Sequence, residues 1–306
     1  MTVNIYDRHL MAKIEATKGT DSVPVLGTND VRIRSGKISA PPEILARNNV
    51  KATMGPQPHL VSPKRLMVLE LEIEVKSSGT LGTAPEYGCL LQACGLSETI
   101  VAVTSVAYDP LTDSHKGVSI YWYEDGLRWN LIGAQGKASF DAQIGQVPIL
   151  KLTMTAPFLG PTAVACPAAG SMVFQSAAPM VMNSADVIND GAAIKVGAFS
   201  LEDGNDVQHH YTTGNSEVVM AGRTPKIKLT KDSVSTAAEW NALTAGTNLA
   251  LSATFGTVAA TRLVVTAPVA RRESVSPAVR ADRPTHEVAY GLYESAGDDA
   301  FKFFFG

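Results

Sequence analysis

The segment at residues 66–75, LMVLELEIEV, constrains the fold of this chain more than any other feature. Apolar and acidic side chains alternate along it: Leu69, Leu71, Ile73 and Val75 fall on one face, and Glu70, Glu72 and Glu74 on the other. A period of two residues is typical of a β-strand with one buried and one solvated face. Such a strand needs partners and a core, so the pattern predicts a sheet-based protein.

Other segments repeat this β character. Residues 118–134 predict a hairpin, because an Asp-Gly pair separates two runs rich in β-branched and aromatic residues. Residues 149–155 predict another strand, and helical patterns are confined to two short segments, 85–94 and 236–245.

The order of features in the first half of the chain recurs in the second half. A first strand, a polar stretch, an alternating strand, a short helix, a hairpin and a strand after a proline follow one another twice. Tyr87 in the first helix corresponds to Trp240 in the second, and Pro148 corresponds to Pro284. The competing interpretation is that β-rich chains look alike at this level.

We therefore predict a mainly β (α+β) fold with two tandem β-sandwich or barrel units, each carrying one short α-helix. The first unit is expected at residues 1–160 and the second at 161–306. The junction falls in a linker at about 160–180, where proline and alanine are frequent.

Composition excludes several classes of function. The formal net charge of −3 lacks the basic excess of proteins that grip nucleic acid phosphates. Residues 152–185 carry no charge, but prolines and glycines interrupt them, which predicts a linker with strand pieces and no membrane span. Cys89, Cys94 and Cys166 lack metal-ligand spacing and are expected to be packing thiols of a chain made in a reducing cytoplasm. The N-terminus shows no signal peptide.

No pattern of catalysis is visible. The sequence lacks GxSxG, Walker A, GxGxxG and HExxH arrangements. Asp109, Asp113 and His115 lie in DPLTDSHK, which is more typical of an exposed turn than of a cation site. We predict no catalytic residue, no cofactor and no metal. The C-terminal FKFFFG is expected to pack either on its own core or on a neighbouring copy.

Three segments carry a resemblance to a known family. KIEATKGTDSVPV at 13–25, followed by VRIRSGKIS, is similar to the opening of siphophage major tail tube proteins. SSGTLGTAPEYGCLLQACGLSET at 77–99 resembles their strand, linker and short helix, and residues 121–158 resemble their hairpin and closing strand. The likeness is strongest over 13–160.

The resemblance implies a structural virion protein with the tail tube fold, made in the bacterial host cytoplasm and located in the tail. Its subunits would form rings that stack into a tube whose channel passes genomic DNA without specific binding. Because some relatives with two fused tube domains build trimers, we expect a homotrimeric ring with pseudo-sixfold symmetry. Implied partners are the tape measure protein and the terminator or distal tail proteins. The alternatives are another phage or secretion-system component, such as a baseplate part, a non-assembling β-sandwich binding module, or an unrecognised hydrolase.

Two sets of residues are candidate contacts in such a tube. The first set, for the channel or for lateral pairing between opposite charges, is Glu70, Glu72, Glu74, Lys226 and Lys228. The alternative is a solvated strand face, and Glu72→Lys distinguishes the two because it weakens ring assembly only if the charges pair.

The second set lies in the polar stretches 40–64 and 202–224, which take the place of the loop that in tube proteins reaches the adjacent ring. Its members are Asn48, Lys51, Met54, His59, Asp206, His209, His210 and Tyr211. Both stretches lack periodicity and are expected to be irregular loops, functional because of their length or else idle. Deleting residues 54–62 is expected to leave a folded subunit that does not polymerise.

Overall fold

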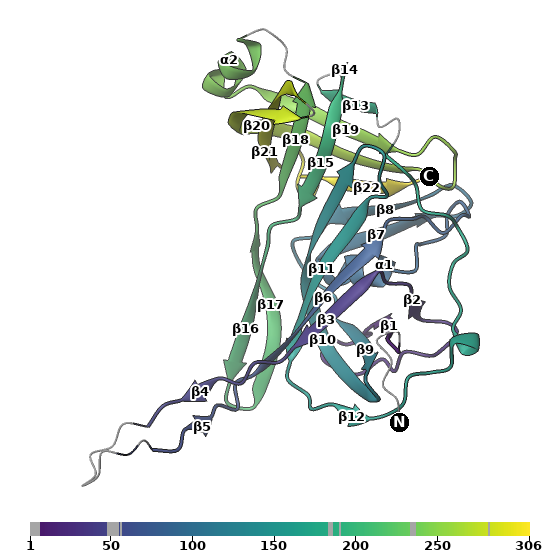
Figure 1. The fold of residues 1–306 in the computed structure, drawn as a ribbon, viewed down its shortest axis with the longest axis vertical. Helices are drawn as coiled ribbons and strands as arrows, with labels where there is room; N and C mark the ends of the chain where they lie inside the picture. The colour runs from purple at the N-terminus through teal and green to yellow at the C-terminus, as the bar shows by residue number, and fades with distance from the viewer. Residues whose placement is uncertain are drawn as a thin grey trace.

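The computed structural model describes residues 7–47, 55, 57–182, 186–189, 191–232, 237–280 and 282–306. The fold is mainly β, as predicted, with one large antiparallel sheet and two short α-helices in the described chain (Figure 1). The helices are α1 (Gly88–Ala93) and α2 (Ala238–Ala245), and a 3₁₀ turn, η1 (Ala169–Ser171), lies in the linker.

Eight strands lie side by side in what we call the long sheet. Their order is β3 (Ser35–Ser39), β6 (Leu66–Glu74), β11 (Ile149–Pro157), β10 (Leu127–Gln143), β15 (Val196–Glu202), β18 (Lys226–Asp232), β21 (Arg283–Tyr293) and β20 (Leu263–Arg280). The first four strands and the last four are connected in the same way, since the chain visits positions one, two, four and three of each set in turn. Direct pairing of β10 with β15 joins the two sets.

Shorter strands form a second layer. One group consists of β1 (His9–Ile14), β2 (Asp30–Val31), β9 (Val118–Glu124) and β12 (Thr162–Ala163), which continue from the first half of β10. The other group consists of β7 (Leu96–Val101), β8 (Ser105–Pro110), β13 (Asp186–Asn189), β14 (Ala192–Ile194), β19 (Asn248–Phe255) and β22 (Lys302–Phe305). The strands β10 and β20 are long enough to belong to both layers, and the apolar core lies between the layers.

The local patterns produce the predicted elements. In β6 the apolar residues Leu69, Leu71 and Ile73 are buried, whereas Glu70, Glu72 and Glu74 face away from the core. Asp125 and Gly126 adopt φ values of 53° and 75°, the left-handed conformations that a tight hairpin turn requires. Both helices lie within the predicted segments.

The C-terminal phenylalanines are buried in the chain's own core. Phe301, Phe303 and Phe305 are at most 5% exposed, and β22 pairs with β20 on one side and with β8 on the other. The last strand therefore connects the second half of the chain to the first half through hydrogen bonds. Burial raises the pKa of the Cys89 thiol to about 12, and that of Cys94 is also raised, which fits packing thiols.

The prediction of an irregular loop at 202–224 was wrong. This stretch forms a regular hairpin of β16 (Asn205–Thr212) and β17 (Asn215–Arg223), closed at Gly214 with φ of 83°. The two-stranded ribbon exposes polar side chains on most of its length, so no apolar period marks it in the sequence. In the other stretch, β4 (Ile44–Leu45) pairs with β5 (Leu60–Val61) in a ribbon that projects from the body, which we call the arm (Figure 1).

Candidate assembly surfaces

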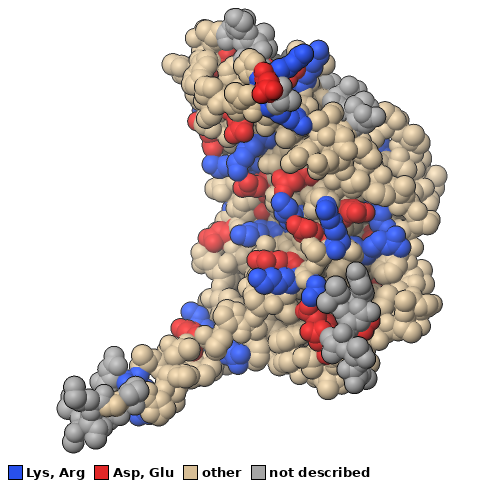
Figure 2. Space-filling view, in the orientation of Figure 1, with Lys and Arg blue, Asp and Glu red and all other residues tan. Residues whose placement is uncertain are grey.

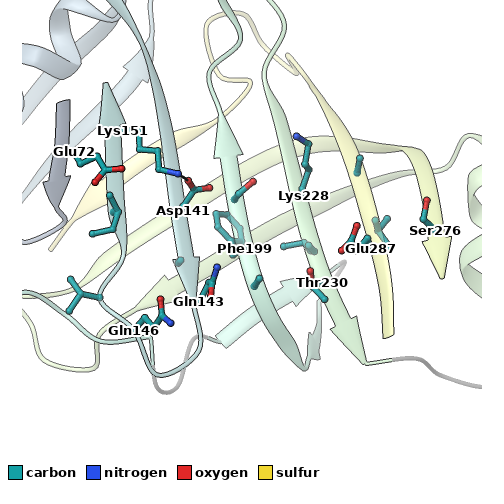
Figure 3. A pocket seen from close by; sticks show the side chains of 18 of the residues that line it. Glu72, Asp141, Gln143, Gln146, Lys151, Phe199, Lys228, Thr230, Ser276 and Glu287 are labelled. Carbon is teal, nitrogen blue, oxygen red and sulfur yellow. Dashed lines mark ion pairs between the residues drawn. The ribbon is translucent and has the colours of Figure 1, made fainter. Parts of the chain in front are cut away.

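The face of the long sheet that points away from the core is a continuous polar surface. A row of residues that are cross-strand partners in register runs over six strands: Ser35, Glu72, Lys151, Ser139, Glu202 and Lys226. Figure 3 shows side chains from successive strands of the sheet standing on this face. The face is hollowed, with a depression lined by Glu72, Asp141, Lys151, Ser200, Lys228 and Glu287 among others.

Acidic and basic groups neutralise one another across this surface. The Lys151 ammonium lies 2.7 Å from Asp141, Lys228 lies 2.8 Å from Glu202, and Lys226 lies 2.6 Å from Glu273. The hydrogen bond to Asp141 raises the pKa of Lys151, so the lysine stays protonated at neutral pH. Figure 2 shows the resulting mixture of blue and red on the hollowed side. Because the pairs are exposed, solvent screens them and they contribute little to stability.

The predicted lateral contacts lie on this face but do not meet within one chain. The strands β11, β10 and β15 separate β6, which carries the glutamates, from β18, which carries Lys226 and Lys228. Three of them have a partner within the chain: Glu72 accepts a hydrogen bond from Ser35 at 2.9 Å, Lys226 pairs with Glu273, and Lys228 pairs with Glu202. Contact of these residues between copies stays a prediction.

The long sheet ends in two strands with a free edge. Within the described residues, β3 pairs only with β6, and the part of β20 beyond Arg272 pairs only with β21. Val279 lies on this part of β20 and is 76% exposed. Ala142 has the corresponding position on β10: its neighbour Asp141 is opposite Ile149, the residue after Pro148, as Ala278 is opposite Thr285, the residue after Pro284. Ala142 is nevertheless 2% exposed, because β15 pairs with this part of β10.

A buried polar cluster joins the β16–β17 hairpin to the first half of the chain. Asp203 accepts hydrogen bonds from the Ala138 N–H at 2.6 Å and the Asn205 amide at 2.9 Å. Arg223 donates to the Gly95 carbonyl at 2.7 Å and to the Asn205 Oδ1 at 2.8 Å. The bonds to Ala138 and Gly95 fix where the hairpin leaves the sheet, because both would be lost if the hairpin moved away from the first half of the chain.

Burial raises the pKa of Asp203 to about 7, although the N–H donors of Ala138 and Asn205 and the nearby Arg223 oppose the shift. Between pH 4 and 7 the folded chain therefore holds a proton that the unfolded chain releases. The free energy of unfolding therefore falls as the pH rises through this window, by up to about 1.4 kcal/mol per pH unit.

We expect Asp203→Asn to remove this part of the pH dependence. Urea unfolding at pH 4.5, 5.5 and 6.5 gives the slope of unfolding free energy against pH for the parent chain and for the variant. The difference between these two slopes measures the contribution of Asp203. Parallel slopes would show that Asp203 is ionised throughout.

The arm presents apolar side chains to solvent. The exposed fractions of Ile44, Leu45, Leu60 and Val61 lie between 44% and 57%. Burying a side chain of this size contributes about 1.5–3 kcal/mol, so the arm is a strong candidate for a contact with another molecule.

Of the candidate stacking residues that the structure describes, one lies in the arm and four lie on β16. Asn48, Lys51 and Met54 lie outside the described residues, and His59 is exposed just before β5. On β16, His209 pairs with Ser216 at 2.9 Å and His210 with Glu217 at 3.3 Å, while Asp206 accepts a hydrogen bond from Gln208 at 2.7 Å. Tyr211 is 42% exposed. Their role in stacking stays a prediction.

No local pattern in the sequence predicts the exposure of Val279 or the burial of the Asp203 cluster. A single valine before an arginine does not indicate an exposed edge position, because the exposure of Val279 depends on which strand is last in the sheet. The Asp-Gly-Asn run at 203–205 is typical of a turn, and only the tertiary contact with β10 buries it.

Within the part of the chain that the structure describes, no group of three His, Cys, Asp or Glu side chains is placed to hold a metal ion. The described helices include none that is long and apolar enough to cross a membrane. The conspicuous features are the polar face, the two free edges and the two ribbons.

A family model described as phage tail tube protein matches residues 7–288, which is most of the chain. The chain belongs to the phage tail tube protein family. A comparison with curated proteins finds no match. Phage tail tube proteins are structural components of the virion tail that self-assemble into a tube and associate with other tail proteins. The predicted family is confirmed at the level of phage tail tube proteins.

Proposed function

We propose that three copies of this tail tube protein close a ring and that the rings stack into the channel through which DNA leaves the capsid. The observation that carries the proposal is the pair of free edges at β3 and β20. An unpaired edge strand readily pairs with a strand of another molecule. A heterologous contact between β20 of one copy and β3 of the next closes into a ring when the rotation between copies is a whole fraction of a turn.

The junction between β10 and β15 inside the chain supplies a template for the junction between copies. There Ala142 pairs with Phe199, a small residue opposite a large one. Gly36 on β3 corresponds to Phe199 on β15. Gly36 pairs with Leu71, which lies opposite Leu152, four residues after Pro148. Phe199 pairs with Leu229, which lies opposite Val288, four residues after Pro284. The template therefore pairs Val279 with Gly36 of the adjacent copy, a large residue opposite one without a side chain.

Three copies would contribute twenty-four strands to the wall, eight from each long sheet. A barrel of that size encloses an aqueous channel. With the polar face inward, acidic and basic groups that are already paired meet the DNA. Such a lining does not accumulate the basic charge that would hold the phosphates, so the DNA is free to slide.

The same template supports the division into two tandem units. We assign the first unit to residues 1–160 and the second to 161–306, because each contributes four strands in the same order to the wall. The resemblance to siphophage tail tube proteins supports a tail of the non-contractile type, with the tape measure protein and the terminator and distal tail proteins as partners.

Electron microscopy of the purified chain tests the proposal. We expect rings or tubes with a central channel, and end-on averages with three copies and six similar lobes. Native mass spectrometry of the smallest closed species is expected to give three times the chain mass of 32.3 kDa. A protein that stays monomeric at high concentration, or rings that contain six copies, would contradict it.

A further inference from the structure

The two short helices end alike but are covered very differently. Gly95 after α1 and Gly246 after α2 both adopt left-handed φ values, 72° and 61°, and each donates its N–H to a carbonyl three residues back. Yet Tyr87 at the start of α1 is 1% exposed, whereas Trp240 in α2 is 43% exposed. No residue of α2 is buried, and in Figure 1 the helix stands apart from the core.

Part of the cover on α1 comes from the β16–β17 hairpin. Arg223 donates hydrogen bonds to the carbonyls of Cys94 and Gly95, where the negative end of the helix dipole favours a cation. A Cβ on Gly95 would lie 2.5 Å from Nη2 of Arg223 and 2.7 Å from Sδ of Met220. The space beside this helix end is therefore filled.

The corresponding space beside α2 is open. A Cβ on Gly246 would meet no atom closer than Cδ of Arg271 at 4.0 Å. Among the described residues, no side chain donates a hydrogen bond to the carbonyl of Ala245 or Gly246.

An arginine at the base of the arm corresponds to Arg223. Val68 and Lys226 have the same place in the long sheet: Val68 pairs with Thr155 and Ser39, and Lys226 pairs with Gly291 and Glu202. Three residues before each stands an arginine, Arg65 or Arg223.

Arg65 is only partly engaged within its own chain. Its guanidinium lies 3.7 Å from the centre of the Phe158 ring, and its buried Nε has no hydrogen-bond partner in the described structure. The side chain therefore has hydrogen-bonding capacity to spare.

We propose that the exposed end of α2 is the docking site for the base of the arm of the adjacent copy in the same ring, with Arg65 of that copy at the Ala245 and Gly246 carbonyls. This inference rests on the proposed ring, because only the β20–β3 junction brings the next arm beside α2. In this contact the base of the arm covers the end of α2 of another copy, as the β16–β17 hairpin covers the end of α1 within one chain. The contact also covers Trp240.

Chemical cross-linking tests the contact. In a Cys166→Ser background, Arg65→Cys and Ala245→Cys are combined, and assembled tubes are treated with a short bis-maleimide. We expect denaturing gels to show dimers and then closed trimers, whereas either cysteine variant alone gives monomers. Tubes that are visible by electron microscopy but yield no cross-linked dimer would overturn the inference and leave the proposed function intact. If the parent protein forms no tubes, the proposed function fails and this inference fails with it.

Substitution provides a second, independent measurement. We expect Arg65→Met and Trp240→Ser each to raise the critical concentration for assembly about tenfold, since each removes part of the interface. Arg65→Lys retains the charge and is expected to recover part of the loss. The thermal unfolding of the unassembled chain should not change for Trp240→Ser, because this side chain is already exposed. Unchanged critical concentrations for Arg65→Met and Trp240→Ser would overturn the contact.

Discussion

Replacing Val279 by aspartate is expected to abolish ring formation while leaving the unassembled chain folded. In one chain this side chain is 76% exposed, so a carboxylate there is solvated and costs little. In the ring it would be buried beside Gly36 of the adjacent copy, and desolvating an unpaired carboxylate costs several kcal/mol. A closed ring contains this junction at every interface, so the penalty is paid repeatedly.

Analytical ultracentrifugation measures the effect as a loss of all species above the monomer, and circular dichroism checks that the monomer is intact. Val103→Asp is the matched control, because Val103 is 81% exposed on the turn between β7 and β8, away from both free edges. Its φ of 58° also suits aspartate. Normal rings from the Val279 variant would refute the β20–β3 junction.

Making the arm polar is expected to stop tube growth after ring closure. The change replaces Ile44, Leu45, Leu60 and Val61 by serine or threonine, with threonine at the β-branched positions. These side chains are about half exposed in the single chain, so their loss leaves the core untouched. If a second copy covers them in the tube, each substitution removes about 1–2 kcal/mol of interface burial, and the effects of many subunits add along the tube.

Electron microscopy distinguishes this outcome from the previous one, because we expect separate rings here and monomers for the Val279 variant. A control with Val173 and Val258 changed to serine removes similarly exposed apolar groups outside the arm. Long tubes from the polar-arm variant would contradict a role for the arm in stacking.

Local patterns in the sequence were sufficient for the individual elements. The alternation in β6 predicts both its extent and its buried face, because the period of a strand is a property of the backbone. The Asp-Gly pair predicts the turn between β9 and β10 for a similar reason, since its φ values depend on two neighbouring residues. The family resemblance follows from the order of such elements.

Local patterns did not predict the features that depend on contacts between segments distant in sequence. The hairpin at Asn205–Arg223 has polar residues on most of its exposed surface, so its pairing left no apolar period to detect. The raised pKa of Asp203 comes from its burial in the folded chain, next to Ala138, which is distant in sequence. The partners of Glu72 and Lys228 within the chain, Ser35 and Glu202, were also not predicted, because strand order, and not sequence order, determines which side chains are adjacent.

The sequence by itself determined that this chain is a β protein, where both short helices and the strands of residues 66–75, 118–134 and 149–155 lie, and that it belongs with phage tail tube proteins. Only the tertiary structure decided which strands end the sheet, which apolar side chains remain uncovered and which helix lacks a cover. The physical reason is that backbone periodicity and turn preferences act over a few residues. Exposure at an edge is a relation between segments that lie more than a hundred residues apart, as Gly36 and Val279 do.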